Sequence, residues 1–265
     1  MSLGATTRLH ADEADKSSSR SAIILLVVVL LVAGYSVLYG LQTLAWAEAK
    51  SWGRANPWLM EVPKPLPPPA ISTDAKGTLV KTRLYEFSAP WKDEPKSEPS
   101  LAYTQYHFKA GQVIVFFDPE SELDALSSLK NSNPAQYQKF ANVFAGHSLE
   151  TNYALYQAVY SASPAQMSPF LPLSDALRMN VLVLWKLGFG FDAHPPLYSF
   201  EWGQARGFQF GDPATGGPVA LRIFDDRDRQ FRFLFTTVPG SGATLTQDDI
   251  NFVIQTLRPV PLNEQ

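Results

Sequence analysis

The sequence contains no cysteine, and this absence excludes several kinds of chemistry at once. A chain without thiols forms no disulfide, binds no metal through thiolates and has no cysteine nucleophile. Histidine is scarce as well: there are four, and none is spaced as His-x-x-x-His or His-x-His, the patterns that present two imidazoles to one metal ion. The sequence therefore predicts no metal site and no cofactor.

The chain also lacks a strong excess of charge of either sign. Its 22 basic and 25 acidic residues leave a net charge of −3 at pH 7, and no basic stripe alternates with aromatic side chains. A protein that binds nucleic acid needs such a stripe to neutralise phosphates. We therefore expect no nucleic-acid partner.

One long segment carries no charge at all. Residues 21–47 contain no acidic or basic side chain, and their first half is almost entirely aliphatic. A helix rises about 1.5 Å per residue, so about 20 apolar residues cross a hydrocarbon layer of roughly 30 Å. Tyr35, Tyr39 and Trp46 lie toward the far end of the segment, where aromatic rings favour the membrane–water interface. The segment predicts a single transmembrane anchor over 21–47, with the lipid bilayer as its partner.

A cleaved signal peptide is the competing interpretation of this segment, because residues 45–47 have the small-x-small form of a cleavage site. The apolar run is about twice as long as a usual signal-peptide core, which favours an uncleaved anchor. Its orientation depends on basic residues, which nearly balance on the two sides: Arg8, Lys16 and Arg20 precede it, and Lys50, Arg54 and Lys64 follow it. Arg20, at the membrane edge, favours a cytoplasmic N-terminus and an extracytoplasmic domain.

Composition divides the rest of the chain. Residues 1–20 have too few apolar side chains to fold alone, so they predict a disordered tail. Residues 48–76 are rich in proline, which fixes φ and removes amide donors, and they predict an extended stalk. Residues 77–260 carry the periodic apolar patterns of a single globular domain, and residues 261–265 form a short tail.

The order of these patterns predicts an α+β fold. Alternating apolar residues predict strands over 79–87, 102–108, 112–117, 198–202, 208–210, 219–223 and 231–235. Helix start signals occur at Asp118, Asn133, Ser148, Ser174 and Thr246, the last with Asp249 as its capping-box partner. Strands, then helices, then strands are typical of α+β domains. We expect one antiparallel sheet with a central helical insertion, and a C-terminal helix packed on the sheet.

Two loops contain candidate functional residues. In the loop 190–196, Asp192 would orient the ring of His194, and two prolines would stiffen the backbone. This pair is the candidate catalytic site, although a structural role is the more frequent one for a loop histidine. The acidic run 225–229 lacks the glycine and the distal glutamate of a calcium loop, so it predicts a charged hairpin turn.

The predicted anchor, together with the lack of a recognisable catalytic motif, favours a non-enzymatic domain at the cell envelope. Its role would be binding or assembly, with an envelope protein or a small ligand as the partner. The alternative is a membrane-tethered hydrolase whose site lies near Asp192 and His194. Replacement of His194 by alanine separates the two hypotheses, because loss of function with the fold intact would favour the enzyme.

Overall fold

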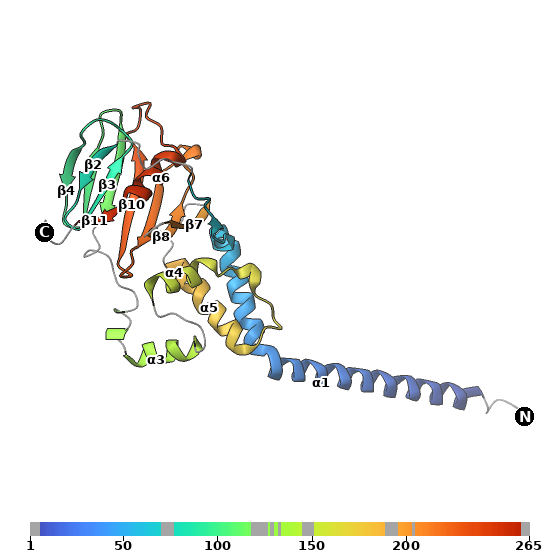
Figure 1. Cartoon of the computed structure of the whole chain (residues 1–265). Helices are drawn as coiled ribbons and strands as arrows, with labels where there is room; N and C mark the ends of the chain where they lie inside the picture. The colour runs from blue at the N-terminus through green and yellow to red at the C-terminus, as the bar shows by residue number, and fades with distance from the viewer. Residues whose placement is uncertain are drawn as a thin grey trace, which may run out of the picture.

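The computed structural model describes residues 6–69, 77–117, 127, 130–131, 134–144, 151–188, 196–202 and 205–260. Within these residues the chain has an α+β fold, with an eight-stranded sheet, a three-stranded sheet and five α-helices, so the predicted fold class is confirmed. Figure 1 shows the strands at the upper left, a group of helices below them, and one long helix that leaves the domain as an isolated arm.

The eight-stranded sheet has the order β1-β7-β8-β9-β10-β6-β5-β4. Its strands are β1 (Lys64–Pro65), β4 (Lys96–Pro99), β5 (Tyr103–His107), β6 (Gln112–Phe117), β7 (Leu197–Trp202), β8 (Ala205–Phe210), β9 (Val219–Phe224) and β10 (Gln230–Thr237). Neighbouring strands are antiparallel except β1, which runs parallel to β7. The sheet is therefore mixed, and the prediction of a purely antiparallel sheet is wrong at this edge, because a strand that precedes the predicted domain pairs with it.

The second sheet consists of β2 (Thr78–Lys81), β3 (Tyr85–Ala89) and β11 (Arg258–Pro259), in the order β11-β3-β2. The single strand predicted over 79–87 is therefore a hairpin. Its turn is closed by Thr82, whose hydroxyl donates to the carbonyl oxygen of Tyr85 at 2.9 Å and accepts from the Tyr85 amide at 3.0 Å. Short polar side chains stabilise turns in this way, and they compete with the extended backbone.

In the described part of the chain, the first strands are followed by the α-helices α3 (Pro134–Val143), α4 (Asn152–Ser161), α5 (Leu173–Gly188) and α6 (Gln247–Thr256). The predicted capping box of α6 is present, since the Thr246 hydroxyl accepts from the Asp249 amide at 3.1 Å and the Asp249 carboxylate accepts from the Thr246 amide at 2.9 Å. The cap of α4 is Thr151. The start signals predicted at Asp118, Asn133 and Ser148 lie outside the described residues.

Two apolar cores lie on opposite faces of the large sheet. The first lies between this sheet and the small sheet with α6, and it buries Phe87, Phe233 and Ile254. The second lies between the large sheet and the helices α4 and α5, and it buries Tyr160 and Phe208. Because strand side chains alternate between faces, strands with apolar residues on both faces are able to support both cores. Packing of α6 against β3 gives the arrangement predicted for the C-terminal helix.

The N-terminal helix α1 (Thr6–Ala55) has two parts, Val27–Ser36 and Tyr39–Ala55, that meet at an angle of 68°. The second part packs on α5, whereas the part before the bend forms the isolated arm in Figure 1. In the described part of the chain, no single helix has both the length and the apolar character to cross a membrane; the two parts of α1 meet that requirement only together. The helix starts at Thr6, so it includes residues of the predicted disordered tail.

Residues 48–66, predicted to belong to an extended stalk, pack on the domain instead. The short helix η1 (Pro57–Met60) buries Leu59 completely, and the amide of Leu66 donates to the carbonyl oxygen of Ser199 at 2.8 Å. Pro57 begins η1 and Pro65 ends β1 at the sheet edge, two positions where the missing amide is not needed. Residues 70–76 of the predicted stalk lie outside the described residues.

Candidate functional site

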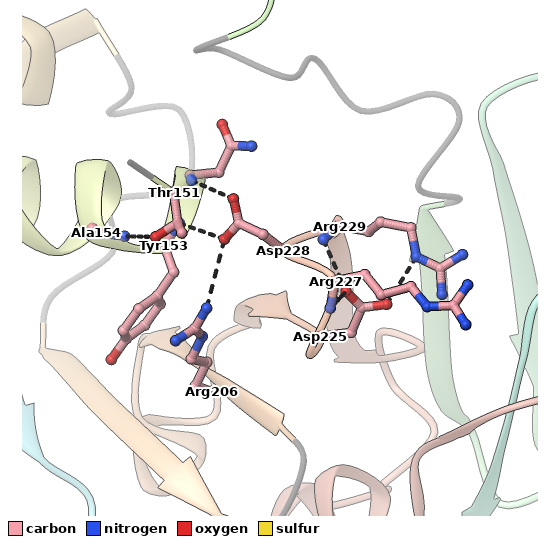
Figure 2. Close-up of polar contacts among 9 residues, drawn as sticks. Thr151, Tyr153, Ala154, Arg206, Asp225, Arg227, Asp228 and Arg229 are labelled. Carbon is pink, nitrogen blue, oxygen red and sulfur yellow. Dashed lines mark hydrogen bonds and ion pairs between the residues drawn. The ribbon is translucent and has the colours of Figure 1, made fainter. Parts of the chain in front are cut away.

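The predicted catalytic pair, Asp192 and His194, lies outside the residues that the structure describes, so its role stays a prediction. Of the two loops singled out in the sequence, the structure describes the turn between β9 and β10. Figure 2 shows how the polar side chains of this turn meet α4, β8 and the backbone around them.

Asp225 organises the first half of the turn. Its carboxylate is nearly buried and accepts four hydrogen bonds, from the Tyr85 hydroxyl at 2.7 Å, the Arg229 Nε at 2.8 Å, and the Arg227 and Arg229 amides at 3.0 and 2.9 Å. Burial, reinforced by the hydrogen bond to Asp225, raises the pKa of Tyr85 well above its usual range. A carboxylate has about four lone-pair positions, so the chain itself occupies the acceptor capacity of Asp225. Its role is structural.

Asp228 occupies the second half of the turn and fixes the start of α4. Its backbone is left-handed, with φ of 60°, a conformation that aspartate and asparagine tolerate better than most residues. Its carboxylate accepts from the amides of Asn152 and Tyr153, the latter at 3.0 Å, and lies 3.7 Å from the Arg206 guanidinium. Arg206 in turn lies over the Tyr153 ring, 4.4 Å from its centre. The run 225–229 is thus a charged hairpin turn that joins the sheet to α4.

Substitutions at Asp228 test this structural role. Asp228→Ala should lower the free energy of unfolding by about 2 kcal/mol, because two helix N-terminal amides lose their acceptor. Asp228→Asn should cost less than about 1 kcal/mol, because asparagine keeps an oxygen acceptor and tolerates the left-handed backbone. Urea unfolding followed by circular dichroism measures both values. Equal losses for the two variants would contradict the capping role.

A cleft at the opposite end of the large sheet is the second candidate site. Eight residues line it: Pro213, Ala214, Gly216, Gly217, Thr237, Ala243, Thr244 and Leu245. They come from the β8–β9 connection, the last residue of β10 and the loop before α6, which meet because β9 begins and β10 ends at this end of the sheet. None of the eight side chains is ionisable, so the lining supplies no general acid or base. It offers hydroxyls, backbone groups and apolar surface.

Hydrogen bonds hold both walls of the cleft in place. On one wall, the Asp212 carboxylate accepts from the amide of Ala214 at 2.8 Å, and Gly216 adopts φ of 72°, which a residue with a side chain rarely does. On the other wall, the Gln112 side chain donates to the carbonyl oxygen of Thr244 at 3.5 Å. The cleft is therefore formed before any ligand arrives, as binding pockets usually are.

Lys186 is the third unusual polar residue. It is fully buried on α5, and its ammonium group donates to the carbonyl oxygens of Tyr160 and Ala162 at 2.9 Å, of Leu59 at 3.3 Å, and of Glu61. Burial lowers the pKa of this amine to about 8, even though the Glu61 carboxylate opposes the shift. Its partners are backbone groups of two other segments, so Lys186 is a structural crosslink.

No metal-binding cluster accompanies these sites: across the ranges that the structure describes, no three His, Asp or Glu side chains come together in a group that could hold an ion. Comparisons of the chain with known protein families, with characterised proteins and with solved structures find no significant match. The function of the chain is therefore inferred from its own geometry.

No pattern in the sequence indicates the cleft. Its lining combines glycine, alanine, proline, threonine and leucine from two separate loops, and these residue types are common in ordinary turns. The only local signal is the turn 211–213, which marks a connection without marking a site. Only the pairing of β9 with β10 brings the two loops together.

Proposed function

We propose that this chain is a single-pass, membrane-anchored domain that binds a partner at the extracytoplasmic surface of the cell envelope and performs no catalysis. The exposure of the arm is the observation that carries this proposal. The six consecutive residues from Val27 to Val32 are each 49–67% exposed, and they cover all sides of the helix. Apolar surface in water costs about 25 cal/mol per Å². A lipid environment removes that cost, whereas no packed element of the described chain does so.

The charges around the arm support the proposed orientation. Arg20 lies at the N-terminal edge of the uncharged segment, and basic residues collect on the cytoplasmic side of a membrane span. An N-terminus in the cytoplasm then puts the sheets, the cleft and the C-terminus outside. The bilayer is the first partner in this proposal.

The cleft supports binding of an uncharged ligand. Because its lining contains no ionisable side chain, a charged group would enter it without a counter-charge and at a desolvation cost. The hydroxyls of Thr237 and Thr244 and the backbone of the glycine-containing wall suit the amides of an extended peptide. We therefore assign a neutral, extended segment of an envelope protein as the ligand class.

One substitution blocks the cleft without disturbing its backbone. A Cβ added to Gly217 would meet only the Thr215 hydroxyl oxygen, at 3.5 Å, and the backbone there is not left-handed. Gly217→Arg should therefore fill the cleft and leave the fold intact. Gly188→Arg is the matched control, because it adds the same side chain at the end of α5, where a Cβ meets no atom of the described residues within 4 Å.

The experiment is crosslinking of the full-length protein in its native membrane, followed by purification. A stoichiometric partner should be recovered with the wild type and Gly188→Arg, and at least about tenfold less with Gly217→Arg, the equivalent of about 1.4 kcal/mol. Alkaline carbonate should leave all three proteins in the membrane pellet. Release into the supernatant would refute the anchor, and equal partner recovery would refute the cleft. The alternative hydrolase would gain support if His194→Ala abolished cellular function while the variant unfolded like the wild type.

A further inference from the structure

We infer that the base of the arm docks the domain against the bilayer, so that its helical layer lies in the lipid–water interface in a fixed orientation. This inference rests on the proposed membrane anchor and adds to it the position of the domain. It concerns six apolar side chains around the bend of α1, here named the collar: Tyr35, Leu41, Leu44, Phe170, Leu173 and Leu177. Each of them is between 38% and 68% exposed.

Contacts between α1 and α5 join the collar into one surface. The ring of Phe170 lies 6.4 Å from that of Tyr35 and 6.0 Å from that of Tyr39, so the segment before α5 covers the bend. Further along, the Asn180 side chain donates to the carbonyl oxygen of Ala45 at 3.5 Å. The two helices therefore run side by side away from the bend, and their exposed leucines extend the surface that begins at the aromatic rings.

The bend angle orients this surface toward the membrane. If the arm follows the membrane normal, the second part of α1 lies about 22° from the membrane plane, the complement of the 68° bend. Tyr39–Ala55 would then run almost flat along the bilayer surface, with α5 beside it. The sheets would lie on the water side of this helical layer, as their position relative to the arm in Figure 1 requires.

The length of the arm also supports placing the collar at the bilayer surface. From residue 21 to the bend at Ser36 the helix has 16 residues, which rise about 24 Å, whereas the hydrocarbon layer is roughly 30 Å thick. A span that is too short draws its flanking residues into the bilayer. Here the flanking residues are those of the collar, which is apolar and aromatic, as the interface prefers.

The polarity of the second part of α1 changes at the expected distance from the bend. The exposed Leu41 and Leu44 are followed one turn later by the exposed Glu48, which accepts from the Asn180 side chain of α5 at 3.1 Å. The last turn of the helix contains Arg54. A helix that leaves the interface at a shallow angle needs this order, apolar first and charged later. The uncharged surface is continuous from the arm into the collar, so the occupant we assign is the bilayer rather than a soluble protein.

Single cysteines test the inference, because the natural chain has none. In the full-length protein, reconstituted in phosphatidylcholine and phosphatidylglycerol vesicles, a fluorophore is attached at Phe170→Cys, Leu177→Cys or Leu101→Cys. Leu101 is the control, since it is fully exposed in the turn between β4 and β5, at the edge of the sheet farthest from the arm in Figure 1. Lipids carrying a shallow nitroxide should quench the two collar positions at least about fivefold more than position 101.

The outcomes separate this inference from the proposed function. If carbonate extracts the protein from the vesicles, the anchor fails and the docking fails with it. If the protein stays in the vesicles but the collar positions are quenched no more than position 101, the anchor stands and the docking is refuted. If the collar is shielded from an aqueous quencher without being quenched by lipid, protein covers it, and the bilayer is the wrong occupant.

Discussion

A fragment that begins at Gly77, the domain boundary predicted from the sequence, should fail to fold stably, whereas a fragment that begins at Tyr39 should retain the fold. The first fragment lacks Leu59, which is fully buried, and Ala45 and Ala49 of the second apolar core. It also lacks strand β1. Full burial of a large apolar side chain is worth about 1.5–3 kcal/mol, and three half-buried tryptophans from the same segment pack on this core. The summed loss approaches the whole stability of a typical domain, about 5–15 kcal/mol.

Thermal unfolding by circular dichroism and gel filtration, both in the same mild detergent, measures this difference. The Tyr39 fragment should unfold cooperatively and elute as a defined species. The Gly77 fragment should either aggregate or unfold at least about 10 °C lower. Equal unfolding temperatures would show that residues 39–66 only rest on the domain, and the predicted boundary would then be correct after all.

Lys186→Met should destabilise the protein by about 3 kcal/mol at pH 7, because four carbonyl oxygens, three of them in buried hydrogen bonds, lose their donor while the aliphatic volume is kept. Lys92→Met is the matched control: Lys92 is exposed, so its loss should change the free energy of unfolding by less than about 0.5 kcal/mol. Urea unfolding of both variants and the wild type gives these values. A Lys186→Met protein as stable as the wild type would mean that water replaces the amine at no cost.

The difference in the free energy of unfolding between the wild type and Lys186→Met should also depend on pH, in one direction. Burial lowers the pKa of Lys186 from 10.5 to about 8, so between these values the unfolded chain holds a proton that the folded protein has released. Stability then rises with pH. The advantage of the wild type over Lys186→Met should therefore grow by about 3 kcal/mol between pH 8 and 10.5, while other titrating groups cancel between the two proteins. A constant difference would show that the carbonyl hydrogen bonds keep the amine charged.

Local chemistry decided much of the secondary structure. The capping box of Thr246 and Asp249 starts α6 where the sequence predicts, and α3 begins at Pro134, next to the predicted start signal. Alternating phenylalanines mark β10 because period-two patterning and an extended backbone are both properties of neighbouring residues. The predicted strand over 79–87 failed because the turn depends on one hydroxyl, that of Thr82, in a segment that otherwise alternates.

The predicted stalk shows where composition misleads. Proline marks both extended linkers and the ends of short elements, and only the tertiary structure distinguishes them. Lys186 shows the same limit. In the sequence it interrupts an apolar helix, and in the structure its amine donates hydrogen bonds to carbonyl oxygens of two segments that lie 24 or more residues away in the chain. No local pattern encodes such partners.

By itself the sequence determined the cysteine-free chemistry, the uncharged segment 21–47, the α+β order of elements and the capped start of α6, because each of these depends on residue type or on contacts within about one turn. Only the tertiary structure decided that residues 48–66 belong to the domain and that Asp228 accepts from the first amides of α4. It also decided that residues from two separate segments form one cleft, and that Phe170 packs at the bend of α1. These features join residues far apart in the chain, and their positions are set by sheet pairing and core packing, which act only when the whole domain folds.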